Sequence, residues 1–250
     1  MFPLLRMFLV IIAALAAQTI PLESLSGRRM TPLEGNTHHV QGIDIRGSRL
    51  YLTAVDRAAG KGYLFEYDLA SGKRLRAQEV QSGQMIHPGG LQVDGDSLWL
   101  PVAEYRRDGR SRIERRSLET LAVLASFEVD DHIGAIACGN GRLYGANWDA
   151  RRIYDWTREG KLIRRRDNPS PVAYQDMKFI HGALVASGPG FVHWLDPETL
   201  SIRRQITTGA TDRGASFTKE GMAVSGGSLY LLPEDAPSRL FEYRLSPETR

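Results

Sequence analysis

The chain has 250 residues, of which 42% are hydrophobic and 24% are charged. This composition excludes a disordered or fibrous protein and is ordinary for a folded globular one. The formal net charge is only +3 at pH 7, so charge alone gives no reason to expect a nucleic-acid partner. Cys138 is the single cysteine, which excludes an internal disulfide, and a chain of this length can bury a core without one.

The first 16 residues have the pattern of a secretory signal peptide. Arg6 provides the positive charge, residues 7–15 form an apolar run, and Ala14 and Ala16 provide the small residues of a cleavage site. The alternative is an uncleaved membrane anchor, but the apolar run is shorter than the ~20 residues that span a bilayer. We therefore expect an exported protein, periplasmic or extracellular, with residues 17–250 forming one domain and no stable membrane insertion after cleavage.

Five short segments of similar pattern recur along the rest of the chain. In each, alternating apolar residues are followed by a small turn, usually with glycine, and a second apolar run. The segments begin, 41 to 48 residues apart, at Gln41, Gly89, Gly134, Gln175 and Glu220. Third and fourth alternating runs complete the unit, as at 63–67 and 75–80 in the first one. Four strands per unit at this spacing are typical of propeller blades, so the sequence predicts an all-β, five-bladed β-propeller with four-stranded blades.

The last unit lacks a fourth strand, because the alternating run at 239–245 is its third and the chain then ends. Residues 25–33 precede the first unit and have no other role in the repeat. We expect this N-terminal strand to complete the last blade. Pairing the two ends of the chain would close the ring and remove exposed strand edges.

Aligning the five units places histidines and acids at recurring positions. The first strand of a propeller blade lines the central channel, and its beginning opens on the same face as the loop between the second and third strands. Two residues before the aligned segments, three blades carry a histidine: His39, His87 and His132. Six residues after the leucine that opens the second strand, four blades carry an acid: Asp56, Glu104, Asp149 and Asp235. The fourth blade lacks both and offers Asp176 instead.

Histidines and carboxylates that converge on one axis have two chemical uses. Neutral imidazoles bind zinc or another divalent transition metal ion together with a carboxylate, which makes His39, His87 and His132 the expected metal ligands. Alternatively, a histidine oriented by a carboxylate acts as a general base. A structural explanation also stands, since repeats arise by duplication and a residue can recur because it fits a turn. The expected ligand-binding residues around the histidines are Asp56, Glu104, Trp148, Asp149, Asp176, Glu220 and Asp235.

Several blade motifs resemble those of the plant and bacterial glutamine cyclotransferases. They are Val-Gln-Gly-Ile at 40–43, Tyr-Leu-Phe-Glu-Tyr-Asp-Leu at 63–69, Ser-Gly-Lys at 71–73 and Leu-Phe-Glu-Tyr at 240–243. The resemblance covers nearly the whole chain and implies a secreted five-bladed propeller that cyclises N-terminal glutamine. It also implies a catalytic glutamate before the glycine of the second blade's first strand, where this chain has Gly89. The histidine series is a further departure from that family.

The sequence thus predicts that the polar axial face binds a small molecule, a sugar or a peptide, with or without a metal ion. One alternative is an enzyme, either a metal-dependent lyase or hydrolase or a cyclotransferase-like acyl transferase. Another is a protein-interaction scaffold that uses the rim. The arginine-rich stretches at 106–116 and 164–166 contain no aromatic residue between the arginines, so we expect solvated surface there and no nucleic-acid partner.

Overall fold

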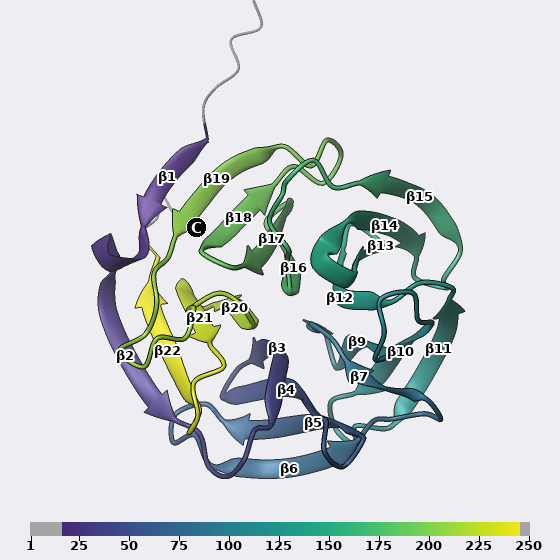
Figure 1. Cartoon of the computed structure of the whole chain (residues 1–250), viewed down its shortest axis with the longest axis horizontal. Coiled ribbons are helices and arrows are strands. Elements are labelled where there is room, and N and C mark those ends of the chain that lie inside the picture. Colours follow the sequence, from purple (N-terminus) through teal and green to yellow (C-terminus); the bar gives the residue numbers. More distant parts are fainter. Residues whose placement is uncertain (1–16, 246–250) are drawn as a thin grey trace, which may run out of the picture.

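The computed structural model describes residues 17–245, which form a ring of five sheets around a central axis (Figure 1). The expected signal peptide lies outside the described residues. Each sheet is a blade of four or five strands, with its first strand innermost and later strands farther out. This arrangement confirms the predicted five-bladed propeller. Among residues 17–245 there is no helix long and apolar enough to span a membrane.

The strands follow the predicted repeat, and four blades are built from consecutive strands. Blade one contains β3 (His39–Arg46), β4 (Arg49–Asp56), β5 (Lys61–Asp68) and β6 (Arg74–Glu79). Blade two contains β7 (Met85–Pro88), β8 (Gln92–Asp94), β9 (Ser97–Glu104), β10 (Ser111–Ser117) and β11 (Val123–Val129). Blade three contains β12 (Ile133–Gly139), β13 (Arg142–Asn147), the 3-10 turn η2 (Trp148–Ala150), β14 (Arg152–Thr157) and β15 (Leu162–Asp167). Blade four contains β16 (Asp176–Ile180), β17 (Ala183–Gly188), β18 (Phe191–Leu195) and β19 (Ile202–Thr207).

Blade five joins the two ends of the described chain. It contains β20 (Gly221–Ser225), β21 (Ser228–Leu232), β22 (Arg239–Arg244) and, as its outer strand, β2 (Ser26–Pro32). Thr31 is paired with Leu240 in the antiparallel β2·β22 ladder, which confirms that the N-terminal strand closes the ring.

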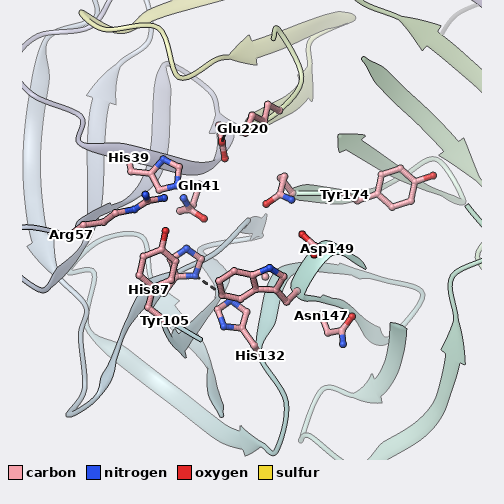
Figure 2. A pocket seen from close by; sticks show the side chains of 14 residues that line it. His39, Gln41, Arg57, His87, Tyr105, His132, Asn147, Asp149, Tyr174 and Glu220 are labelled. Atoms are coloured by element: carbon pink, nitrogen blue, oxygen red, sulfur yellow. Dashed lines mark hydrogen bonds and ion pairs between the residues drawn. The ribbon is translucent and has the colours of Figure 1, made fainter. Parts of the chain in front are cut away.

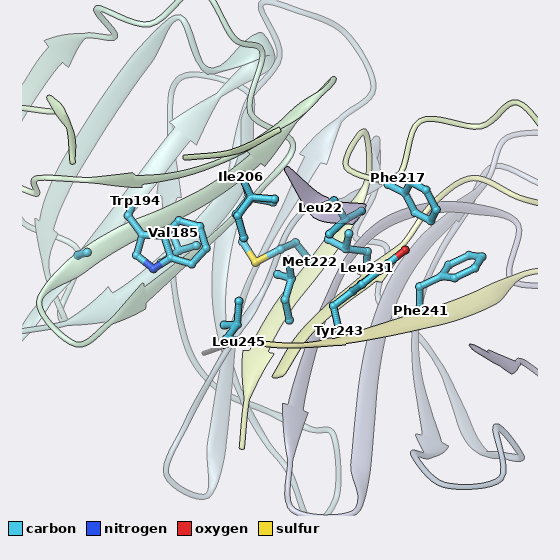
Figure 3. Packing of buried hydrophobic residues seen from close by; sticks show 13 residues of the cluster. Leu22, Val185, Trp194, Ile206, Phe217, Met222, Leu231, Phe241, Tyr243 and Leu245 are labelled. Atoms are coloured by element: carbon cyan, nitrogen blue, oxygen red, sulfur yellow. The ribbon is translucent and has the colours of Figure 1, made fainter. Parts of the chain in front are cut away.

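The residues before β2 add a strand that the repeat did not predict. β1 (Gln18–Pro21) runs parallel to β19 on the outside of blade four, with Ile20 opposite Ile206. The 3-10 turn η1 (Leu22–Ser24) then carries the chain across to blade five. Leu22 is buried in a hydrophobic cluster that includes Ile206 of blade four and Met222 of blade five (Figure 3). The N-terminal segment therefore holds two adjacent blades together.

Outer-strand arginines fasten neighbouring blades to each other. Arg76 on β6 pairs with the buried Glu66 of its own blade and donates a 2.6 Å hydrogen bond to the carbonyl of Glu119 in blade two. On the closing strand β2, Arg29 donates in the same way to the carbonyl of Ala70 in blade one, at 3.0 Å. The junction made by the chain ends thus uses the same kind of contact as an ordinary blade junction.

One buried carboxylate ties several blades together at the axis. Asp176 begins β16 of blade four and has no exposed surface. It accepts hydrogen bonds from the backbone N–H groups of Ile43 in blade one and Met222 in blade five, each at 3.0 Å. The buried ammonium of Lys178 completes its partners. Gly90 of blade two packs against it so closely that a Cβ there would lie 2.5 Å from the carboxylate.

We predict that Asp176→Ala lowers the free energy of unfolding by about 3–5 kcal/mol, because it leaves a buried ammonium without its carboxylate and three backbone N–H groups without their acceptor. Urea denaturation measures this change. Asp167→Ala, on the exposed outer strand β15, is the control and should change stability by less than about 0.5 kcal/mol. A similar, small effect of both substitutions would contradict the role given to Asp176.

Candidate functional site

A cavity of about 210 Å³ opens where the inner strands of the blades begin. The first residues of the five repeat segments form a ring around the axis. Four of the five residues of this ring line the cavity, and they are Gln41, Gly134, Gln175 and Glu220. The rest of the wall comes from the beginnings of the inner strands and from the loops between the second and third strands of blades one to three (Figure 2).

The structure brings most of the predicted axial residues into this one cavity. All three histidines of the repeat line it, together with three of the predicted ligand-binding residues: Trp148, Asp149 and Glu220. Asp149 has a φ of 59° within η2 and pairs with Arg107 at 2.5 Å. The cavity is lopsided toward blades one to three, where the histidines lie.

Two predicted acids point away from the cavity. Neither lines it: Asp56 lies 3.4 Å from His38, and Glu104 lies 2.6 Å from Arg106. The residues that follow them, Arg57 and Tyr105, line the cavity instead. β4 ends at Asp56 and β9 at Glu104, so Arg57 and Tyr105 are the first residues of the loops that follow. Their shared position, seven residues after the leucine that opens the second strand, was the signal by which the sequence could have identified them.

The remaining two predicted acids have structural partners. Asp235 is buried between Arg213, at 3.2 Å, and Arg239 of β22. Asp176 is the axial carboxylate described above and is not part of the cavity wall. Both therefore hold the fold around the cavity rather than face a ligand.

His87 and His132 form a hydrogen-bonded pair whose proton positions follow from their partners. Nδ1 of His132 lies 2.8 Å from the carbonyl of Glu104 and 3.1 Å from that of Arg106. Carbonyls only accept, so this nitrogen carries the proton and Nε2 has a lone pair. That lone pair is 3.2 Å from Nδ1 of His87, which must donate to it. Neutral His87 is left with an unprotonated Nε2.

Burial keeps this pair neutral. Desolvation lowers the pKa of His87 well below 6.5, and the neighbouring His132 lowers it further. Desolvation also lowers the pKa of His132, partly opposed by its two carbonyl contacts. The His87 ring stacks on Tyr105 with ring centroids 4.3 Å apart. The pair thus forms a rigid wall that accepts hydrogen bonds.

His39 belongs to a separate group of side chains at the cavity (Figure 2). Its Nδ1 lies 2.8 Å from Glu234 Oε1, and Glu220 is close to both. Burial lowers the pKa of His39, opposed by Glu234. Burial also raises the pKa of Glu220 to about 8, opposed by Lys219. The three predicted histidines therefore divide into a pair and a single residue, and both ring nitrogens of His132 are bonded within the protein.

Arg57 is a cation of the cavity wall, and its positive charge partly opposes the rise in the pKa of Glu220 across the cavity. Its guanidinium lies 5.1 Å from the centroid of the Tyr105 ring. Within residues 17–245 no carboxylate lies at ion-pair distance from it. Trp148 closes the wall beyond His132, with ring centroids 4.6 Å apart. An arginine held by an aromatic face and without a carboxylate partner is suited to bind an anionic group.

We predict that ¹⁵N NMR of the imidazoles finds both His87 and His132 as the Nδ1–H tautomer, each with a pKa below the ordinary 6.5 because burial disfavours the charged ring. The pKa of His87 is lower in the folded chain than in the unfolded one. Acid therefore protonates the unfolded chain first, and the free energy of unfolding falls as the pH drops below 6.5. His87→Gln should lose part of this acid sensitivity. A His87 ring with an Nε2–H proton, or one that titrates near pH 6.5, would contradict the hydrogen-bond pattern.

Comparisons with known proteins place the chain in a fold and a family. The glutaminyl cyclase of Myxococcus xanthus has a similar structure, with a TM-score of 0.68, 18% sequence identity, and coverage of 86% of this chain and 94% of its own. At this identity the likeness shows the fold alone, and it confirms the resemblance in fold that the blade motifs indicated. The WD40 domain of Neurospora crassa Pan2 matches with a TM-score of 0.48 and 14% identity, covering 84% of this chain and 67% of its own. No curated protein matches the sequence. Residues 26–180 match the model of a family of unknown function, DUF6454, and the chain therefore belongs to that family.

Proposed function

We propose that the axial cavity binds a small polar molecule that carries a carboxylate or a similar acidic group. Arg57 is the observation that carries this proposal, because its guanidinium borders the cavity without a carboxylate partner in the described part of the chain. Stacking on Tyr105 holds the guanidinium in place, and a fixed guanidinium fork suits two oxygens of one acidic group. Lys219 is also in the wall, but its ammonium is paired with Glu220 and Glu234, which leaves Arg57 to bind the acidic group.

The rest of the wall suits a ligand that also has hydrogen-bond donors. His87 presents an unprotonated nitrogen, and the amides of Gln41 and Gln175 both accept and donate. A volume of about 210 Å³ is below the ~300–1,000 Å³ of sites for drug-sized ligands. These features together favour a small ligand such as an amino acid, a single sugar acid or the carboxyl end of a short peptide.

A panel of these three ligand classes tests the proposal by thermal shift and calorimetry. At least one carboxylate-bearing compound should bind, and its methyl ester should bind more weakly. Arg57→Gln should weaken binding by about 10–100-fold, as expected for the loss of a charge-assisted contact. Arg110→Gln removes an arginine of the same face outside the cavity and should leave the affinity unchanged. Binding that prefers uncharged compounds, or that survives Arg57→Gln, would refute the proposed ligand class.

The enzymatic alternative, cyclisation of N-terminal glutamine, has a specific obstacle in blade two. Gly89 stands where the glutamine cyclotransferase resemblance implies a catalytic glutamate, and a Cβ there would lie 2.1 Å from the carbonyl oxygen of Gly134. A backbone oxygen cannot withdraw as a flexible side chain can, so a side chain at position 89 requires the two blades to separate. The cavity therefore supports binding better than this chemistry.

We predict that a peptide with N-terminal glutamine is not converted to the cyclic product when it is incubated with the purified chain. Mass spectrometry detects the product through the loss of ammonia. The peptide is also part of the ligand panel, so binding without turnover is a distinguishable result. Turnover above the uncatalysed rate that Arg57→Gln or His87→Gln abolishes would establish the enzymatic alternative instead.

A further inference from the structure

We propose that His39, Glu220 and Glu234 hold a divalent transition metal ion, such as zinc, at the edge of the axial cavity. One ligand atom from each of the three side chains lies within 4.8 Å of the other two. His39 begins β3 of blade one, whereas Glu220 precedes β20 and Glu234 follows β21 of blade five. The ion would therefore join two blades. The proposal uses the same cavity as the proposed function but not its ligand, so the ion can be tested alone.

The spacing of the three groups requires only a small adjustment. His39 Nδ1 lies 2.8 Å from Glu234 Oε1. Two ligand atoms about 2 Å from one ion in a tetrahedral arrangement are roughly 3.3 Å apart. The ion would take the place of the proton now shared between His39 and Glu234, and that proton would move to Nε2 of the ring. A histidine in the set favours transition metals over calcium and magnesium, which prefer oxygen ligands alone.

Glu220 gives independent support, because it is a buried carboxyl group with very little around it to satisfy its charge. It is 3% exposed, and its side chain points into the cavity (Figure 2). Its one close partner among residues 17–245 is the ammonium of Lys219, 3.6 Å away. Taking a carboxylate out of water is costly unless hydrogen bonds or an opposite charge compensate it. A divalent ion bound at Glu220 would supply that compensation.

Lys219 occupies the position of a competing cation. Its ammonium lies 3.6 Å from Glu220 Oε1 and 3.7 Å from Glu234 Oε2, between the two acids. The side chain is 53% exposed and has a flexible stem, so it can withdraw into solvent when an ion binds. The arrangement therefore predicts that removal of the positive charge at Lys219 strengthens metal binding.

Three protein ligands leave at least one coordination position for a further group, as in zinc sites that bind small molecules. Glu220 and His39 both line the cavity, so this position faces the space in which we place the organic ligand. An acidic group held by Arg57 could then complete the coordination. This part of the inference rests on the proposed function, whereas the ion site itself does not.

Calorimetric titration of the purified, untagged full chain with Zn²⁺, and the visible spectrum with Co²⁺, test the site. We expect one ion per chain. Glu220→Gln and His39→Ala should each weaken binding by about 100-fold, and Lys219→Met should strengthen it by about tenfold. His38→Ala is the matched control for His39→Ala, because the neighbouring His38 faces Asp56 instead, and it should leave the affinity unchanged.

Several outcomes would overturn the proposal. They are the absence of saturable binding, equal binding by wild type and Glu220→Gln, weaker binding by Lys219→Met, and loss of binding on His87→Ala but not on His39→Ala. The last result would place the ion at the pair of His87 and His132 instead. If Glu220→Gln does not fold, as judged by circular dichroism, Glu234→Gln at the more exposed acid provides the test. Repeating the carboxylate panel with EDTA separates this site from the proposed function, because Arg57-dependent binding without an ion would sustain that function alone.

Discussion

The ring is organised around the buried carboxylate of Asp176. A propeller leaves a polar axis at its centre, because the inner strands of different blades are too far apart to form one continuous sheet. Backbone N–H groups that face this axis need acceptors, since an unpaired buried N–H is costly. Asp176 serves blades one and five together while Lys178 balances its charge. Gln175, which precedes Asp176 in the chain, lines the cavity. The hydrogen bonds of Asp176 therefore help to fix the shape of the cavity.

The fold was predictable because propeller blades repeat at the level of single residues. Apolar alternation and glycine turns at each unit fixed the number of blades and the order of strands, and the incomplete last unit pointed to the N-terminal strand as its partner. β1 was not predictable by the same means. Residues Gln18–Pro21 have no alternating apolar pattern, and their strand conformation comes from the exposed edge of β19, with which they pair in parallel.

The sequence predicted which blade positions meet at the candidate site, but not the hydrogen-bond partners of the side chains there. The aligned blades correctly grouped His39, His87 and His132 at one cavity. They could not show that His132 is turned toward the carbonyls of Glu104 and Arg106, because that depends on the path of the loop between β9 and β10. The predicted acids divide in the structure: Asp149 and Glu220 line the cavity, whereas Asp56 and Glu104 do not. In blades one and two the next residue of the chain, Arg57 or Tyr105, lines the cavity instead.

The pairing of β2 with β22 also determines when the molecule can exist as a ring. During synthesis β2 emerges before blades one to four and β22 emerges after them, so blade five cannot be completed until all four have been made. Until then β2 is an unpaired edge, open to pairing with other chains, and such non-local pairing is slow to form. Newly made molecules would therefore need protection of the unpaired β2 until β22 is made. A chain that stops before β22 would leave β2 unpaired permanently.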